Sequence, residues 1–195
     1  TTVAAQPLPT ETTVTPAPIQ SENFVTPEPI RVALRLVNYA ALVLLGGLLF
    51  VEYYLAKGSV TTFAARRIVR ASTIALALAP LASFFIFMND VRNTGESFTS
   101  AFSTAISLTP GLMLAARAGI GVLLAGFLHR AIQQGEMTKP FLHRIGALFT
   151  ISCVALAYGG HSRSQAVPLL GIPADVLHVM SISLWLGGLA ALLLV

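Results

Sequence analysis

Charged residues are scarce in this chain of 195 residues, where Asp, Glu, Lys and Arg together make up 10%. Soluble domains carry about 25% charged and roughly 45–50% apolar residues. Here 55% of the residues are hydrophobic and the mean hydropathy is +0.77. Most of the chain therefore cannot be a soluble globular, disordered or coiled-coil protein. The composition instead predicts a membrane protein with several spans, whose helices contact the lipid bilayer.

Cysteine is nearly absent too, because Cys153 is the only one, and this excludes an intrachain disulfide. No Gly-x-x-x-x-Gly-Lys motif is present, so nothing indicates transport driven by a bound nucleotide. The net charge of +4 does not indicate nucleic-acid binding. The basic residues stand in short patches between apolar runs, as they do in cytoplasmic loops.

The first 30 residues differ in composition from the rest. They contain six prolines and seven threonines, and their only charges are Glu11, Glu22 and Glu28. Such a segment cannot bury enough apolar surface to fold, which predicts an extended linker over residues 1–30. The chain begins with Thr, shows no signal peptide and ends inside an apolar run. We therefore expect it to be part of a longer protein, with a soluble domain before the linker.

Five apolar runs follow, each about as long as the ~20 residues that a helix needs to cross a bilayer. They cover about Val32–Leu55, Ile68–Asn89, Pro110–Leu128, Phe141–Gly159 and Pro173–Val195. Backbone groups in lipid need partners within the segment, so the runs predict an all-α, polytopic membrane helix bundle with five transmembrane helices. Pro80 predicts a kink in the second helix. The segment Glu96–Leu108 is expected to be a loop or a short surface helix.

The distribution of Lys and Arg predicts the orientation. Seven of these residues lie on one side of the predicted helices and at most four on the other. The larger group is Lys57, Arg66, Arg67, Arg70, Arg130, Lys139 and Arg144, and the smaller group is Arg31, Arg35, Arg92 and Arg163. The richer side should be cytoplasmic. The amino terminus then lies outside, as do the loops near Asp90 and His161.

Potential metal ligands gather at the outer face in this topology. Asp175 and His178 are expected on the first turns of the fifth helix, three residues apart and thus on one side of it. The other candidates are His161, Met88, Met113 and Met180. Imidazole binds copper in both oxidation states and thioether sulfur favours Cu(I), so the set suits a copper ion. Methionine is also common packing filler, and a histidine at a helix end is often only interfacial.

Two ionisable residues fall inside predicted spans, where charge is costly and usually has a role. Arg117 lies two turns into the third span, with Asp175 and Asp90 as candidate partners. Glu52 lies less than a turn from the cytoplasmic end and can reach water there. Gly187-Gly188 predicts a close approach between helices, and Trp185 is expected to pack inside the bundle.

The carboxyl-terminal part resembles the copper resistance protein D family. The similarity rests on Gly159-Gly160-His161-Ser162, Asp175-Val176-Leu177-His178 and Leu184-Trp185-Leu186-Gly187-Gly188-Leu189. The run Gly46–Phe50 is also similar to the family's first helix, with less specificity. The resemblance covers about residues 31–195, which we interpret as the transmembrane domain, cut short at its carboxyl end.

The resemblance implies a bacterial inner-membrane protein of about eight helices that takes up copper through His161 and His178. It also implies a periplasmic copper-binding partner of the resistance protein C type, either separate or fused before the linker. Some relatives carry a cytochrome oxidase assembly domain instead, which would follow Val195. We expect a transporter in the plasma membrane, not an enzyme.

Two other functions stay open. A b-type haem electron carrier would use the histidines in two layers, His129 with His143 and His161 with His178. A helper subunit that binds no metal would use the helices only as a scaffold.

Overall fold

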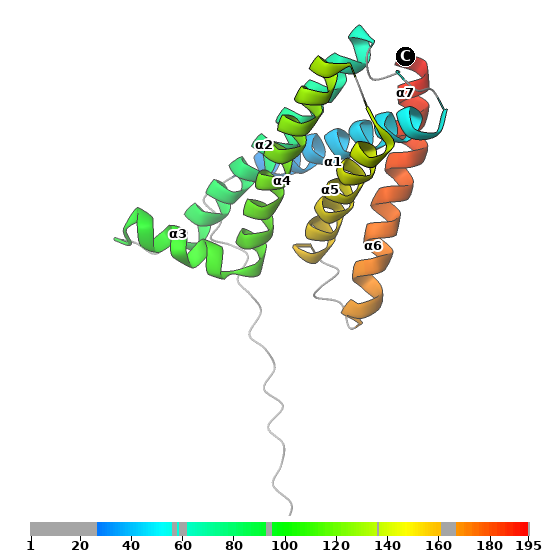
Figure 1. Cartoon of the computed structure of the whole chain (residues 1–195). Coiled ribbons are helices and arrows are strands. Elements are labelled where there is room, and N and C mark those ends of the chain that lie inside the picture. Colours follow the sequence, from blue (N-terminus) through cyan, green and yellow to red (C-terminus); the bar gives the residue numbers. More distant parts are fainter. Residues whose placement is uncertain are drawn as a thin grey trace, which may run out of the picture.

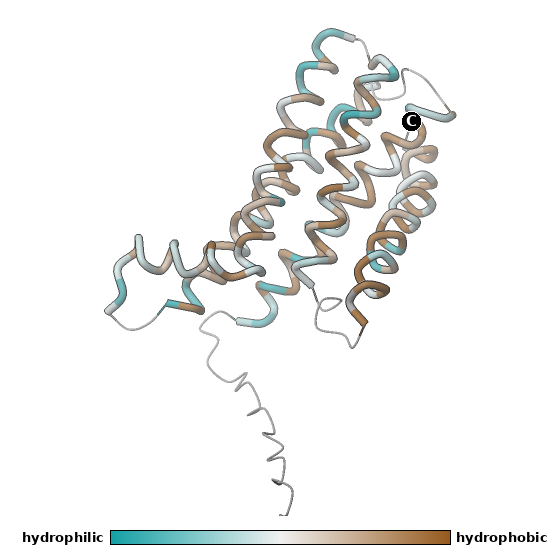
Figure 2. Tube along the Cα trace, turned by 60° about the horizontal axis from the view of Figure 1, so that its bottom comes forward, coloured by the Kyte–Doolittle hydropathy of each residue, from teal (hydrophilic) through white to brown (hydrophobic). Residues whose placement is uncertain are grey.

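The computed structural model describes residues 27–55, 58, 62–92, 95–135, 137–160 and 167–194, and among these it contains helices and turns but no strand. Five of the helices are long and apolar enough to cross a membrane: Glu28–Leu55, Phe63–Val91, Thr109–Gln134, Lys139–Tyr158 and Leu169–Leu193. The predicted five-helix membrane bundle is therefore confirmed. Figure 2 shows hydrophobic residues along the lengths of these helices and hydrophilic ones mainly near their ends.

The elements follow one another as α1 (Glu28–Phe50), η2 (Val51–Leu55), α2 (Phe63–Val91), α3 (Phe98–Ser107), α4 (Thr109–Gln134), α5 (Lys139–Tyr158), α6 (Pro168–Ile182), η5 (Ser183–Gly187) and α7 (Gly188–Leu194). The π-helical turns η2 and η5 continue α1 and α6 without a break in the chain. Figure 1 shows α2 and α4 side by side and antiparallel, with α1 crossing behind them and α5 and α6 beside it.

The up-and-down order of the helices gives the bundle two ends. At one end α1, α4 and α6 begin while α2 and α5 finish; we call it the Asp90 end. At the other, the Lys139 end, α2 and α5 begin and α4 finishes. The basic residues Arg66, Arg67, Arg70, Arg130, Lys139 and Arg144 belong to the helix turns of the Lys139 end. The structure thus gathers the described members of the larger basic group at one end.

A short helix, α3, stands where a loop or surface helix was expected, and the second alternative is confirmed. Ser97 caps it by accepting a hydrogen bond from the backbone N–H of Ser100 at 3.3 Å. Its small residues Ala101 and Ala105 are buried against Phe84 and Met88. Figure 1 shows α3 projecting sideways at the Asp90 end.

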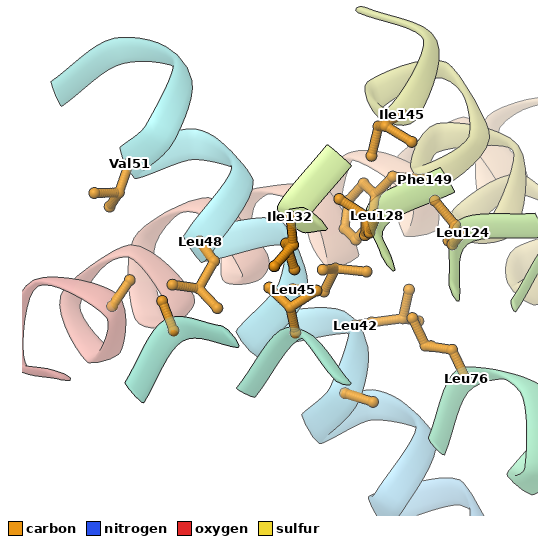
Figure 3. Packing of buried hydrophobic residues seen from close by; sticks show 14 of the residues in the cluster. Leu42, Leu45, Leu48, Val51, Leu76, Leu124, Leu128, Ile132, Ile145 and Phe149 are labelled. Carbon is orange, nitrogen blue, oxygen red and sulfur yellow. The ribbon is translucent and has the colours of Figure 1, made fainter. Parts of the chain in front are cut away.

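The main hydrophobic core lies between α1, α2, α4 and α5 (Figure 3). Leu42, Leu45 and Leu48 of α1 are fully buried, and leucines of α4 such as Leu124 and Leu128 pack on them. In lipid, close packing of this kind replaces the hydrophobic effect as the force that holds helices together. The core therefore fixes how the helices are rotated, and so which side chains face the space at the Asp90 end.

Glycines bring α1 and η5 into backbone contact. A Cβ on Gly187 would collide with the carbonyl oxygen of Val43 in α1, and one on Gly47 would collide with the backbone of Gly187. A Cβ on Gly188 would meet only a ring carbon of Phe50 at 3.7 Å, an ordinary contact. The predicted close approach is confirmed, and Gly187 is the residue that requires it.

The helix α2 continues through Pro80, which is buried in the bundle. Proline has no N–H, so it cannot satisfy the carbonyl of Leu76 one turn earlier. Gly121 of α4 packs directly against this carbonyl: a Cβ there would lie 2.5 Å from both the carbon and the oxygen. The helices α2 and α4 thus come into contact where Pro80 frees a carbonyl on one and Gly121 leaves room on the other.

Two expectations about the last span are wrong. The helix begins at Pro168 rather than Pro173, because Pro168 occupies the first turn, where a missing N–H costs nothing. Trp185 is not packed inside the described bundle, since 75% of it is exposed. Ser183 and Gly187 face α1, and the residue midway between them lies on the opposite side of the helix.

Candidate functional site

A cavity of about 450 Å³ lies at the Asp90 end, between α1, α2, α4 and α5. Its polar lining consists of Arg31, Arg35, Asn38, Tyr39, Ser83, Asp90 and Arg117. Of the predicted copper ligands that the structure describes, Met113 lines this cavity. The lining also includes Gly160, the residue that precedes His161 in the chain.

Asp90 pairs with Arg31. The Nη2 of Arg31 donates to Oδ2 of Asp90 at 2.8 Å, and the two side chains are 14% and 3% exposed. This ion pair joins the beginning of α1 to the end of α2. The expected pairing of Arg117 with Asp90 is wrong, because the ion pair of this carboxylate is with Arg31 and none joins it to Arg117.

Arg117 lies about 12 Å along α4 from Thr109, at ~1.5 Å per residue. No ion pair joins it to Asp175 or to any other acidic residue that the structure describes. Its Nε is buried and has no hydrogen-bond partner among the described residues. The candidate intramembrane charge thus faces a polar cavity and lacks a protein counter-charge in the described part of the chain.

Asn38 was not singled out from the sequence. It is 3% exposed and lines the cavity, and neither its Oδ1 nor its Nδ2 has a partner among the described residues. A buried amide usually has hydrogen bonds, so an unpartnered one facing a cavity points to a missing ligand or water. The signal was available: Asn38 is a polar residue inside the first apolar run.

The predicted methionines take three different positions. Met88 is 7% exposed and packs in the small cluster of α2 and α3 with Phe84. Met180 packs, partly buried, against the main core. Only Met113 of the three lines the cavity. The described structure therefore does not bring these sulfur atoms together at one place.

Asp175 and His178 are both exposed residues of α6. Because α6 begins at Pro168, His178 lies about 15 Å along it at ~1.5 Å per residue, not on its first turns. The helices α5 and α6 pack side by side, as their short connection predicted. His161 lies outside the described residues. Among the described ones, no three His, Cys, Asp or Glu side chains lie together as a metal site.

The Lys139 end has a smaller cavity, of about 160 Å³, which Glu52 lines. Glu52 is 4% exposed, and its Oε1 accepts a hydrogen bond from the backbone N–H of Gly58 at 2.8 Å. Gly58 has φ +85°, a left-handed conformation that favours glycine. The expectation that Glu52 simply reaches water is wrong, because its buried carboxylate binds the backbone of Gly58 beyond the end of η2.

The histidines at the Lys139 end have side-chain partners. The Nε2 of His143 lies 2.9 Å from the hydroxyl of Tyr53, and the Nε2 of His129 lies 3.0 Å from Nε2 of Gln133. Both contacts are exposed. Nε2 is a nitrogen through which a histidine would bind haem iron, so these contacts do not favour the haem interpretation.

The fold and this site define a multi-pass membrane protein with a charged cavity among its helices. Comparison with known families is more specific: residues 26–171 match the family model for the copper resistance protein D-like, N-terminal domain. The chain belongs to this family. The match ends at Gly171, so it includes Gly159–Ser162 but not the later motif residues from Asp175 onward.

A curated relative is the copper transport protein CutJ of Bacillus subtilis (strain 168). It is 32% identical to this chain over 174 residues, which cover 82% of the chain and 31% of the relative. The chain thus spans about a third of the length of the curated relative it matches. No solved structure matches the chain. Family and relative both concern copper resistance or transport, and neither names an enzyme.

Proposed function

We propose that the chain is part of a copper uptake protein of the plasma membrane, which takes up copper ions at the Asp90 end. The family match carries the copper assignment. The grouping of basic residues supports the orientation, because the Lys139 end would face the cytoplasm and the Asp90 end the outside. Residues 1–30 would then link the membrane domain to an extracytoplasmic copper-binding domain or partner of the resistance protein C type.

His161 and His178 are the proposed copper ligands, with Asp175 and Met113 as further donors. The chain positions support this: His161 follows directly on Gly160 at the cavity, and His178 lies deeper along the adjacent helix α6. Copper would be taken up near His161 and move inward past His178. Thioether and imidazole ligands on this path suit Cu(I).

Copper accumulation by cells tests this proposal. Cells that carry the full-length protein should accumulate more copper than cells without it, and His178→Ala should remove most of the difference at equal protein level. His129→Ala is the matched control, since it changes an exposed histidine at the Lys139 end. Equal accumulation by His178→Ala and the unaltered protein would overturn the assignment of His178. An absorption spectrum with a Soret band would instead support the haem carrier.

A further inference from the structure

The cavity at the Asp90 end has the wrong charge for a copper cation. Three arginines line it against a single aspartate, and that aspartate is paired with Arg31. Arg35 and Arg117 remain without an acidic partner among the described residues. Like charges repel most strongly where little water screens them, so the cavity disfavours a free metal cation and favours an anion.

The geometry points to an anion-binding site in this cavity, formed by residues other than the proposed copper ligands, of which Met113 borders the same cavity. Its ligand is a carboxylate or phosphate group held by the guanidinium of Arg117 and the amide of Asn38. Arginine is well suited to this role because its N–H groups match the two oxygens of such a group. The Nδ2 of Asn38 donates a further hydrogen bond, and its Oδ1 accepts one from a hydroxyl or a water on the ligand.

The burial of these polar atoms favours an anion in the cavity. Arg117 lies about 12 Å along α4, a helix that is long and apolar enough to cross a hydrocarbon layer of roughly 30 Å. A charged side chain at this depth normally faces a partner or water. Its Nε and both polar atoms of Asn38 are buried without a partner in the described part of the chain. One anion in the cavity would accept hydrogen bonds from the two donors, Nε of Arg117 and Nδ2 of Asn38, and would balance the charge. Oδ1 of Asn38 is an acceptor and needs a hydroxyl or a water as its partner.

The remaining walls indicate what is attached to the anionic group. Leu34, Phe87, Leu114 and Leu156 line the same cavity, and its volume of about 450 Å³ exceeds what a single small ion needs. An acidic phospholipid combines an anionic phosphate headgroup with apolar acyl chains. A free phosphate or carboxylate ion has the same anionic chemistry without that body. The two sources are separable by experiment.

The test uses the full-length protein in nanodiscs with two sets of probes. The first compares bound lipid, by native mass spectrometry, in nanodiscs of phosphatidylglycerol and of phosphatidylcholine. The second measures binding of inorganic phosphate and of acetate by calorimetry, in phosphatidylcholine nanodiscs. Binding of phosphatidylglycerol alone would identify a lipid site, and binding of the free ions would identify a site for small anions. Either result supports the proposal.

Four variants make the test specific. Arg117→Gln should weaken binding at least 10-fold, and Arg117→Lys, which keeps the charge but loses the paired N–H donors, should weaken binding less. Asn38→Leu, an apolar replacement in a membrane helix that should fold, should weaken binding several-fold. Arg92→Gln is the matched control: it removes an exposed cation at the same end, whose guanidinium donates to the carbonyl of Glu96, and should change nothing.

The proposal is overturned if no probe binds the unaltered protein. It is also overturned if Arg117→Gln and Asn38→Leu both bind as the unaltered protein does. Failure of copper accumulation would leave both sets of binding measurements unaffected, so the anion site and the copper function are tested separately.

Discussion

Gly47 of α1 and Gly187 of η5 meet backbone to backbone, so closely that a methyl group on either residue would overlap the other helix. This contact packs the last span against the first, although the two spans are far apart in the sequence. It also sets the rotation of α6, since Ser183 and Gly187 must both face α1. Asp175, His178 and Trp185 are then exposed.

Gly187→Ala should therefore destabilise the protein, while Gly188→Ala should not. The added methyl at Gly187 meets the carbonyl of Val43, whereas at Gly188 it meets one ring carbon at an ordinary distance. Overpacking of this kind costs about 1–3 kcal/mol. Thermal unfolding of both variants in detergent measures the difference. Equal unfolding temperatures would mean that α1 and η5 separate easily.

The ion pair between Arg31 and Asp90 should stabilise the junction of α1 and α2. Removing one partner of a buried pair leaves the other charge uncompensated, at a cost of about 3–5 kcal/mol. Asp90→Leu should lower the stability by this order, and the double variant Arg31→Met/Asp90→Leu should recover part of it. Arg35→Gln, an exposed residue one turn later, is the control. The single variant Arg31→Met completes the comparison. Urea-induced unfolding would contradict the pair if the losses of stability in Arg31→Met and Asp90→Leu simply add in the double variant.

His161→Ala, His178→Ala and the double variant should share nearly the same defect in copper accumulation. If both histidines bind copper at one site or along one path, removing either one abolishes transport. Removing the second then costs little more. The measurement is cellular copper at matched protein levels. Independent, additive losses would mean that the two histidines serve separate purposes.

The proposed orientation predicts a pattern of chemical labelling. With Cys153 replaced by Ser, a cysteine at Thr99 of α3 should react with a membrane-impermeant reagent added to whole cells. A cysteine at Gln134 should react only after the membrane is permeabilised. Both positions are exposed and belong to opposite ends of the bundle. The reverse pattern would place the Asp90 end, and the proposed copper ligands, inside the cell.

Hydropathy alone determined the five spans, because lipid forces each apolar run to satisfy its backbone groups within itself. For Glu96–Leu108 it left a loop and a short surface helix as alternatives. The boundaries were less certain where prolines compete. Pro168 and Pro173 both fit a first helical turn, and only the packed structure shows that α6 begins at the earlier one. The role of Gly187 was also visible in the sequence, since few other reasons place paired glycines in a membrane helix.

The partners of the charged residues were decided by tertiary structure. The sequence shows that Arg117 lies inside a span, but whether it faces Asp90, Asp175 or a cavity depends on how far each helix is rotated. That rotation comes from contacts such as Gly121 on Leu76 and Gly47 on Gly187, which join segments far apart in the chain. Arg31, next to the linker, thus pairs with Asp90, while Asn38 and Arg117 line one cavity because four helices meet there.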